Sequence, residues 1–236
     1  MCIRDRLSTA LQPNDFVGMS FFLATAIMLA STVFFFVERG DVNKKWRTSM
    51  TVAGLVTGIA FWHYLYMREA QVMGDVTTVF RYIDWLITVP LQIIEFYLIL
   101  AAVTLVPVIL FWKLLGASLL MLIAGFAGEA SLFPVVPAFI VGVAAWIYII
   151  YEVFAGEASK ISANSNNKGG QFAFNALRII LTAGWAIYPI GYYLGYIAGG
   201  TDAGTVNIIY NIADLVNKTA FGLAIWAGAK MDSDNS

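Results

Sequence analysis

Seven long runs of apolar residues restrict the folds that this sequence can adopt. An α-helix needs about 20 consecutive, mostly apolar residues to cross the hydrocarbon core of a bilayer. Runs of this kind cover residues 15–37, 45–67, 77–103, 107–127, 132–155, 171–198 and 204–229. We therefore predict an all-α membrane protein in which seven transmembrane helices form a single bundle over residues 15–230.

The composition of the chain agrees with a bilayer environment and excludes several other classes. Of its 236 residues, 60% are hydrophobic and 12% are charged, whereas soluble domains average roughly 45–50% apolar and about 25% charged residues. The net charge of −1 gives no indication of a nucleic-acid partner. A single cysteine, Cys2, excludes an intrachain disulfide and a cysteine metal cluster, and we predict no metal site.

The segments between the apolar runs predict the orientation of the bundle. Residues 1–14, which lack the apolar core of a signal peptide, are expected to be a disordered lead-in, residues 156–170 a solvated loop, and residues 231–236 a cytoplasmic tail. One set of loops together with the tail holds Arg39, Lys44, Lys45, Arg47, Lys113, Lys160, Lys168 and Lys230, and the other side holds Arg4, Arg6 and Arg68. By the positive-inside rule, the amino terminus faces outside and the carboxyl terminus faces the cytoplasm.

Several charged residues lie well inside the predicted spans. They are Arg81, Asp84, Glu95, Asp214 and Lys218. A charge at the bilayer centre costs about 2.5–3.5 kcal/mol on insertion scales, so these groups must be paired, neutralised or hydrated. Such residues are functional candidates by default. Glu152 and Arg178 lie nearer the cytoplasmic ends, where snorkelling of the side chain to the interface would explain them.

Lys218 is the most informative of these charges. Asp214 precedes it by four residues, so the two lie on one helix face about 6 Å apart along the axis. A structural interpretation is a salt bridge between packed helices. The chemical interpretation is a buried amine that forms a Schiff base with an aldehyde. Its positive charge would then require carboxylate counter-ions, for which Asp84 and Asp214 are candidates.

The third span places two carboxylates at separate levels of the membrane. Glu95 follows Asp84 by eleven residues, so the carboxylates share a helix face but lie about 16 Å apart along its axis. Thr88 and Gln92 lie between them, and Arg81 precedes Asp84 by three residues. This spacing does not suit a shared ion pair. It predicts that the two carboxylates are separate sites along one path through the membrane.

An aldehyde adduct would also need an apolar cavity, and large aromatic residues could form its walls. The candidates are Trp85 in the third span and Trp185, Tyr188 and Tyr192 in the sixth. Aromatic residues are common in membrane bundles, so each of them taken singly is more often a packing residue. Pro90 and Pro189 would kink their helices and open space beside such a cavity.

These motifs resemble the microbial rhodopsin family, and within it the proteorhodopsins. The resemblance covers nearly all seven spans and is densest in "STVFFFVERG", "GLVTGIAFWHYLYM", "RYIDWLITVPL", "EFYLILAA", "GWAIYPIGY" and "IYNIADLVNK". It implies all-trans retinal bound to Lys218 as a protonated Schiff base and light-driven outward proton pumping. It also implies a homo-oligomer of five or six copies in the inner membrane of a bacterium.

The resemblance assigns a role to each charged residue of the spans. Asp84 matches the primary proton acceptor and main counter-ion, Asp214 the second counter-ion, and Arg81 the arginine that balances them. Thr88 matches a hydroxyl one turn beyond the acceptor, and Glu95 matches the proton donor on the cytoplasmic side. An acceptor aspartate, a threonine and a carboxylate donor in this order form the proton-pump pattern of the family.

Two further residues gain a role only from the resemblance. His63 is the only histidine, which excludes a bis-histidine haem, and a lone histidine in an apolar helix is usually a core residue. In proteorhodopsins the matching histidine hydrogen-bonds the acceptor aspartate. Gln92 occupies a position that holds Leu in green-absorbing and Gln in blue-absorbing members, so we predict a blue-absorbing variant.

The sequence leaves the proton-release group and the biological role open. Asp75, Glu129 and Asp202 lie near the outer surface and are interpreted as loop or helix-end charges. A light sensor of the same fold, with slow turnover and a signalling partner, is the main alternative to a pump. A retinal-free carrier with an Asp–Lys gate is a third class, which the absence of visible colour after adding retinal would indicate.

Overall fold

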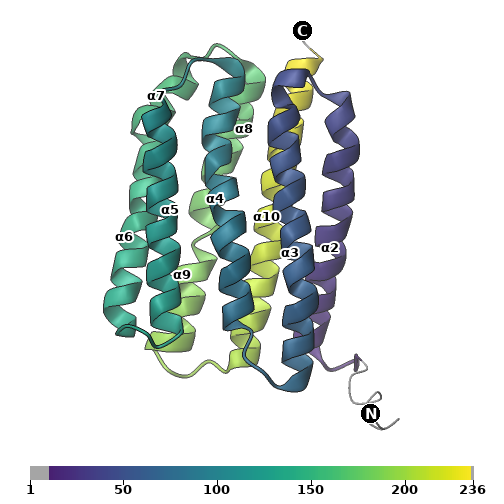
Figure 1. Cartoon of the computed structure of the whole chain (residues 1–236), viewed down its shortest axis with the longest axis vertical. Helices are drawn as coiled ribbons and strands as arrows, with labels where there is room; N and C mark the ends of the chain where they lie inside the picture. The colour runs from purple at the N-terminus through teal and green to yellow at the C-terminus, as the bar shows by residue number, and fades with distance from the viewer. Residues whose placement is uncertain (1–10, 235–236) are drawn as a thin grey trace.

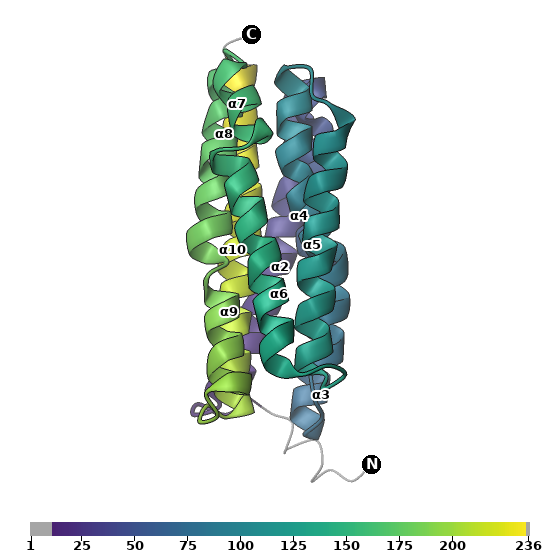
Figure 2. The same cartoon turned by 90° about the vertical axis from the view of Figure 1, so that its left-hand side faces the viewer.

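The protein is an upright bundle of helices, seen in a computed structural model that describes residues 11–234 (Figure 1). Its helices are α2 (Phe16–Glu38), α3 (Arg47–Met73), α4 (Thr78–Val103), α5 (Val108–Glu129), α6 (Val135–Phe154), α7 (Glu157–Asn164), α8 (Lys168–Ile179), α9 (Ile187–Tyr192) and α10 (Ala203–Ser233). The described residues contain no β-strand. The long segments of the described residues are α2, α3, α4, α5, α6, α8 together with α9, and α10. They run alongside one another through the bundle (Figures 1 and 2). The predicted fold class is confirmed.

The two termini lie at opposite ends of the bundle (Figure 1). We call these the amino-terminal end and the carboxyl-terminal end. The expectation for residues 1–14 falls mostly on residues outside the described range, and α2 begins at Phe16 after the Asp15 side chain caps its first turn. At the other end, α10 continues to Ser233, so three residues of the expected tail are helical.

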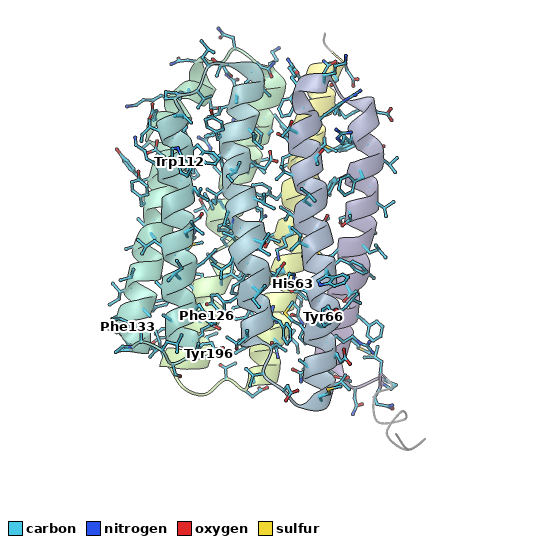
Figure 3. All side chains as sticks on the ribbon, viewed as in Figure 1. His63, Tyr66, Trp112, Phe126, Phe133 and Tyr196 are labelled. Carbon is cyan, nitrogen blue, oxygen red and sulfur yellow. The ribbon has the colours of Figure 1, made fainter. Side chains whose placement is uncertain are left out.

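The outer surface of the bundle is apolar, and its largely hydrophobic core also contains a set of polar side chains. Large apolar side chains cover the outside, as Trp112 and Phe133 illustrate in Figure 3. Within residues 11–234, six segments are long and apolar enough to span a membrane. The seventh, α10, has its apolar residues diluted by buried polar ones. Ten of the buried polar residues that the structure describes lie on two helices: Arg81, Asp84, Thr88, Gln92 and Glu95 on α4, and Asn207, Asn211, Asp214, Asn217 and Lys218 on α10. The functional candidates therefore lie inside the bundle.

The sixth segment is not a regular α-helix. A π-helical turn, Ile180–Gly184, separates α8 from α9, and a second one, Tyr193–Ile197, follows α9. The side chains of Trp146 and Asn217 donate hydrogen bonds to the carbonyl groups of Leu181 (3.1 Å) and Gly184 (3.0 Å) in the first of these turns. Pro189 lies in α9, whereas α4 continues through Pro90 as one helix. The interruption therefore occurs next to Lys218, in contact with Asn217.

The region predicted as a solvated loop is partly helical, so that prediction was wrong. The α7 helix forms over eight residues of the 156–170 segment, and α8 begins within it at Lys168. Glu152 does not snorkel to the interface either. It is buried, and its Oε1 accepts a hydrogen bond from the backbone N–H of Glu157 at 2.8 Å. This acidic side chain thus satisfies an unpaired donor at the start of α7.

Close backbone packing and one acidic residue join the elements at the carboxyl-terminal end. A β-carbon on Gly169 in α8 would overlap the carbonyl oxygen of Gly228 in α10, so the two helices need glycine at this crossing. Nearby, Asp232 accepts hydrogen bonds from the Trp46 indole at 2.7 Å and from the Asn167 amide at 2.5 Å, and it pairs with Lys45 at 2.7 Å. These contacts connect α10 to the chain segments before α3 and α8.

Candidate functional site

The amine of Lys218 lies between two carboxylates at the centre of the bundle. Its Nζ is 3.1 Å from Oδ2 of Asp214 on the same helix, and it also contacts Oδ2 of Asp84 on α4. All three side chains are buried. Two acidic side chains thus face one amine in the interior of the bundle. A buried amine in this position stays cationic only if a carboxylate remains ionised beside it.

Neighbouring hydrogen-bond donors stabilise the charged form of Asp214. Its Oδ2 accepts from the Tyr64 hydroxyl at 2.9 Å, and its Oδ1 accepts from the Tyr188 hydroxyl at 2.7 Å and the Trp85 indole at 3.1 Å. These donors come from α3, α9 and α4. Hydrogen bonds to an ionised acceptor are roughly twice as strong as neutral ones. Asp214 is therefore built to remain an anion.

Asp84 has a different environment, although it contacts the same amine. Its Oδ1 is buried and makes no hydrogen bond. Nδ1 of His63 lies 3.8 Å from this oxygen, beyond hydrogen-bond distance, and is 2.9 Å from the backbone carbonyl of Ile59. The expected hydrogen bond between His63 and Asp84 is thus not formed, although the two side chains are neighbours. Asp84 retains an oxygen that can accept a proton.

Arg81 lies one turn from Asp84 and points toward the amino-terminal end. Its guanidinium donates to the side-chain oxygens of Asn211 at 2.8 Å and Asn207 at 3.0 Å. It also approaches the Tyr64 hydroxyl at 3.4 Å, and this hydroxyl in turn donates to Asp214. Tyr64 therefore links the arginine to the carboxylate through one shared hydroxyl.

Glu95 lies on the same helix toward the carboxyl-terminal end. It is fully buried, and neither carboxyl oxygen makes a hydrogen bond. The hydroxyl of the buried Ser49 is the polar group that faces it. Burying an ionised carboxylate without a partner costs far more than burying the neutral acid. This environment suits a carboxyl group that holds a proton at rest.

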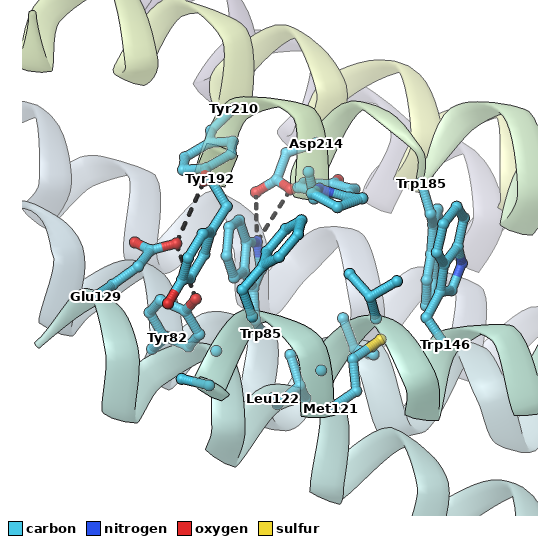
Figure 4. A pocket seen from close by; sticks show the side chains of 18 of the residues that line it. Tyr82, Trp85, Met121, Leu122, Glu129, Trp146, Trp185, Tyr192, Tyr210 and Asp214 are labelled. Atoms are coloured by element: carbon cyan, nitrogen blue, oxygen red, sulfur yellow. Dashed lines mark hydrogen bonds between the residues drawn. The ribbon is translucent and has the colours of Figure 1, made fainter. Parts of the chain in front are cut away.

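An apolar cavity extends beside the amine. Among its walls are the predicted residues Trp85, Gln92, Trp185, Tyr188, Pro189 and Tyr192, together with Lys218 and Asp214 (Figure 4). The amide nitrogen of a buried glutamine is normally paired, but Nε2 of Gln92 has no hydrogen-bond partner. Thr88 lies outside this wall, and its hydroxyl donates to the backbone carbonyl of Asp84 at 2.9 Å. The cavity can accommodate a long apolar group attached to the amine.

The sequence reasoning missed several residues of the site. Met121, Leu122 and Trp146 complete the cavity from α5 and α6. Asn207 and Asn211 hold Arg81, and their positions precede Asp214 and Lys218 with spacings of four, three and four residues. This spacing defines one helix face. The pattern could have identified both asparagines, whereas nothing in the sequence pairs Tyr64 with Asp214.

Comparisons with known proteins agree with this geometry. The family model described as "Bacteriorhodopsin-like protein" matches residues 15–231. A blue-light absorbing proteorhodopsin of Gamma-proteobacterium Hot 75m4 is 58% identical over 229 residues, which covers 96% of this chain and 91% of that protein. A green-light absorbing proteorhodopsin of Gamma-proteobacterium EBAC31A08 is 57% identical over 228 residues, with the same shares covered.

A solved structure is similar over almost the same range. The crystal structure of a blue light-absorbing proteorhodopsin from Med12 has 62% sequence identity and a TM-score of 0.82. The match covers 92% of this chain and 100% of that chain.

Proposed function

Because this chain belongs to the bacteriorhodopsin-like family, whose proteorhodopsins are light-driven transporters and not enzymes, we propose that it is a light-driven outward proton pump. The observation that carries the proposal is the amine of Lys218, held between Asp84 and Asp214 beside an apolar cavity. The chain is a multi-pass membrane protein with bacterial relatives. We place it in the inner membrane, as a ring of five or six copies.

The residues around the cavity support all-trans retinal as the chromophore. Its walls are mainly aromatic and aliphatic, and the buried amine of Lys218 can form an imine with an aldehyde. When bound in this way, retinal would absorb visible light and, on isomerising, lower the proton affinity of the Lys218 nitrogen. The buried indole rings of Trp85 and Trp185 line the cavity and would restrict the shape of its occupant.

The two carboxylates beside Lys218 take different roles because their environments differ. Asp214 accepts hydrogen bonds from three side chains and stays charged as the second counter-ion. Asp84 has an oxygen without a hydrogen bond and receives the proton from the Lys218 nitrogen. Thr88 fixes the α4 backbone carbonyl at Asp84, and Arg81 supplies a positive charge on the amino-terminal side of the pair.

Glu95 returns a proton to the Lys218 nitrogen from the opposite side. It lies toward the carboxyl-terminal end of α4, where burial without a partner favours its neutral form. Eight basic residues lie in the loops and helices at that end, which supports a cytoplasmic position by the positive-inside rule. A proton taken up through Glu95 and passed to Asp84 therefore moves from the cytoplasm toward the outside.

Direct measurement of transport tests the proposal. Cells that contain the protein and retinal are illuminated in unbuffered medium while the pH of the medium is recorded. We expect the medium to become more acidic in light, and a protonophore should abolish this change. Light-induced alkalinisation, or a pH that does not respond to light, would contradict outward pumping.

Gln92 also supports a second candidate function, a slow light sensor. Blue-absorbing family members, which carry Gln at this position, often turn over slowly. Flash absorption kinetics separate the two functions. A pump should reprotonate the Lys218 nitrogen within milliseconds and tolerate continuous light, whereas a sensor should keep it deprotonated for much longer.

Gln92 should set the absorption wavelength. Its amide lines the cavity with Nε2 unpaired, so its dipole can interact with the charge distribution of the chromophore. We predict that Gln92→Leu moves the absorption band to longer wavelength, by an excitation energy on the order of 2 kcal/mol, as for one hydrogen bond to a charged group. Gln171→Leu serves as the control. The Gln171 side chain on α8 donates to the backbone carbonyl groups of Ser162 and Ala163 on α7 and does not line the cavity. An unshifted band in Gln92→Leu would refute this role.

His63 should influence the pH at which the absorption band titrates. Its Nδ1 lies 3.8 Å from the unpaired oxygen of Asp84. Its removal changes an interaction comparable to one hydrogen bond, so we predict that His63→Ala moves the titration midpoint by about one pH unit. Spectra recorded from acid to alkaline pH measure this midpoint. If the midpoint does not move, His63 is only a packing residue.

A further inference from the structure

Glu129, the last residue of α5, lies at the amino-terminal end of the bundle and does not behave as a simple helix-end charge. Its carboxyl group lines both the apolar cavity beside Lys218 and a second, polar cavity at the amino-terminal end. If the proposed pump function holds, the proton must leave through this end of the bundle. We propose that Glu129 is the proton-release group, which gives up a proton to the polar cavity and later regains one from the Asp84 side.

Tyrosine hydroxyls build a defined site around this carboxyl group. Tyr82 and Tyr210 donate to the same oxygen, Oε1, at 2.9 Å and 3.2 Å (Figure 4). The Tyr196 hydroxyl interacts with Glu129 from the side of the polar cavity. Gly125 precedes Glu129 by one helical turn, and a β-carbon there would lie 2.9 Å from the Tyr82 hydroxyl. The glycine thus makes room for a donor to reach Glu129.

Arg81 brings the polar cavity into contact with the interior site. This cavity is lined by Arg81, Asn207, Tyr196 and Tyr210 as well as by Glu129. The Arg81 guanidinium approaches the Tyr64 hydroxyl at 3.4 Å, and that hydroxyl bonds Asp214. A change of charge at the Asp84–Asp214 pair therefore acts on Arg81, which shares a cavity with Glu129. When Asp84 gains a proton, the balancing arginine can interact more strongly with Glu129 and favour its ionised form.

Other acidic groups described at this end are less suitable. Glu69, Asp75 and Asp202 are exposed. Hydrogen bonds from the Thr205 hydroxyl and backbone N–H lower the pKa of Asp202, so it is an anion at neutral pH and has no proton to release. Asp15 accepts from the backbone N–H of Gly18 and caps α2. Glu129 alone among these five combines tyrosine donors with contact to both cavities.

Time-resolved proton release from the retinal-loaded protein tests the proposal. Oriented vesicles are excited with a flash, while a pH-indicator dye reports protons on the outer side and absorbance reports deprotonation of the Lys218 nitrogen. In Glu129→Gln we expect unchanged deprotonation but a delay of about 100-fold or more in proton appearance, the contribution typical of a positioned acid. Asp202→Asn, which keeps a side-chain oxygen to cap α10, should release protons at the normal time.

Infrared difference spectra supply an independent measurement. The unmodified protein should lose a protonated-carboxyl signal at the time of release, and this signal should be absent from Glu129→Gln. Normal release timing in Glu129→Gln would overturn the proposal. If that variant does not fold, Tyr82→Phe removes one donor and should still alter the timing, and normal timing in it would equally overturn the proposal. Failure of the unmodified protein to release protons outward would instead refute the pump function.

Discussion

Replacing Lys218 with alanine should give a protein that stays colourless when all-trans retinal is added. Lys218 is the only lysine that lines the described apolar cavity, and its side chain is buried. Without it, no covalent link to an aldehyde can form at this site. Visible absorption spectra of the purified variant, recorded before and after adding retinal, measure the effect. We expect complete loss of the band and of light-driven pH changes.

Lys113→Ala is the matched control for this prediction. Lys113 lies on α5 with its Nζ paired to Glu157 at 3.3 Å, remote from the cavity, so its replacement should leave the spectrum unchanged. Hydroxylamine should bleach the unmodified protein, since it competes with the amine for the aldehyde. A coloured Lys218→Ala variant, or a spectrum resistant to hydroxylamine, would disprove the chemistry assigned to this amine.

The parts of this arrangement that depend on local spacing could be predicted from the sequence. Asp214 and Lys218 are four residues apart in one helix, and the structure places their charged atoms 3.1 Å apart. The apolar runs likewise predicted the seven segments, because span length is set by bilayer thickness. The turn structure of the sixth segment could not be predicted, since its carbonyl groups are satisfied by Trp146 and Asn217 from other helices.

Contacts between distant parts of the chain set the limit of sequence reasoning. Tyr64 meets Asp214 across 150 positions, and no local pattern indicates this hydrogen bond. Glu129 resembled a helix-end charge because its tyrosine partners, Tyr82 and Tyr210, come from α4 and α10. The 156–170 segment was predicted to be a loop from its polar composition, but the buried Glu152 side chain caps a helix there. Tertiary contacts override composition in each of these cases.

The unequal environments of the two carboxylates beside Lys218 lead to the second large effect. Asp84→Asn removes the group that can receive a proton, because Asp84 has an unpaired oxygen while the oxygens of Asp214 are occupied. We expect Asp84→Asn to bind retinal and absorb light, with Asp214 still balancing the cation. Its light-driven proton transport should fall by at least about 100-fold, as expected when a positioned proton acceptor is lost.

Asp214→Asn provides the comparison that makes this prediction specific. An amide at this position presents an N–H₂ group to the donors Tyr64, Trp85 and Tyr188, so at least one of them loses its acceptor. The expected effect is a loss of pigment stability of about 1–3 kcal/mol, measured by thermal bleaching, and not a selective loss of transport. Full transport by Asp84→Asn, or pigment loss in Asp84→Asn with normal pigment in Asp214→Asn, would reverse the assignment. The assignment assumes that the hydrogen bonds around each carboxylate decide which one accepts the proton. Either of these outcomes would refute that assumption.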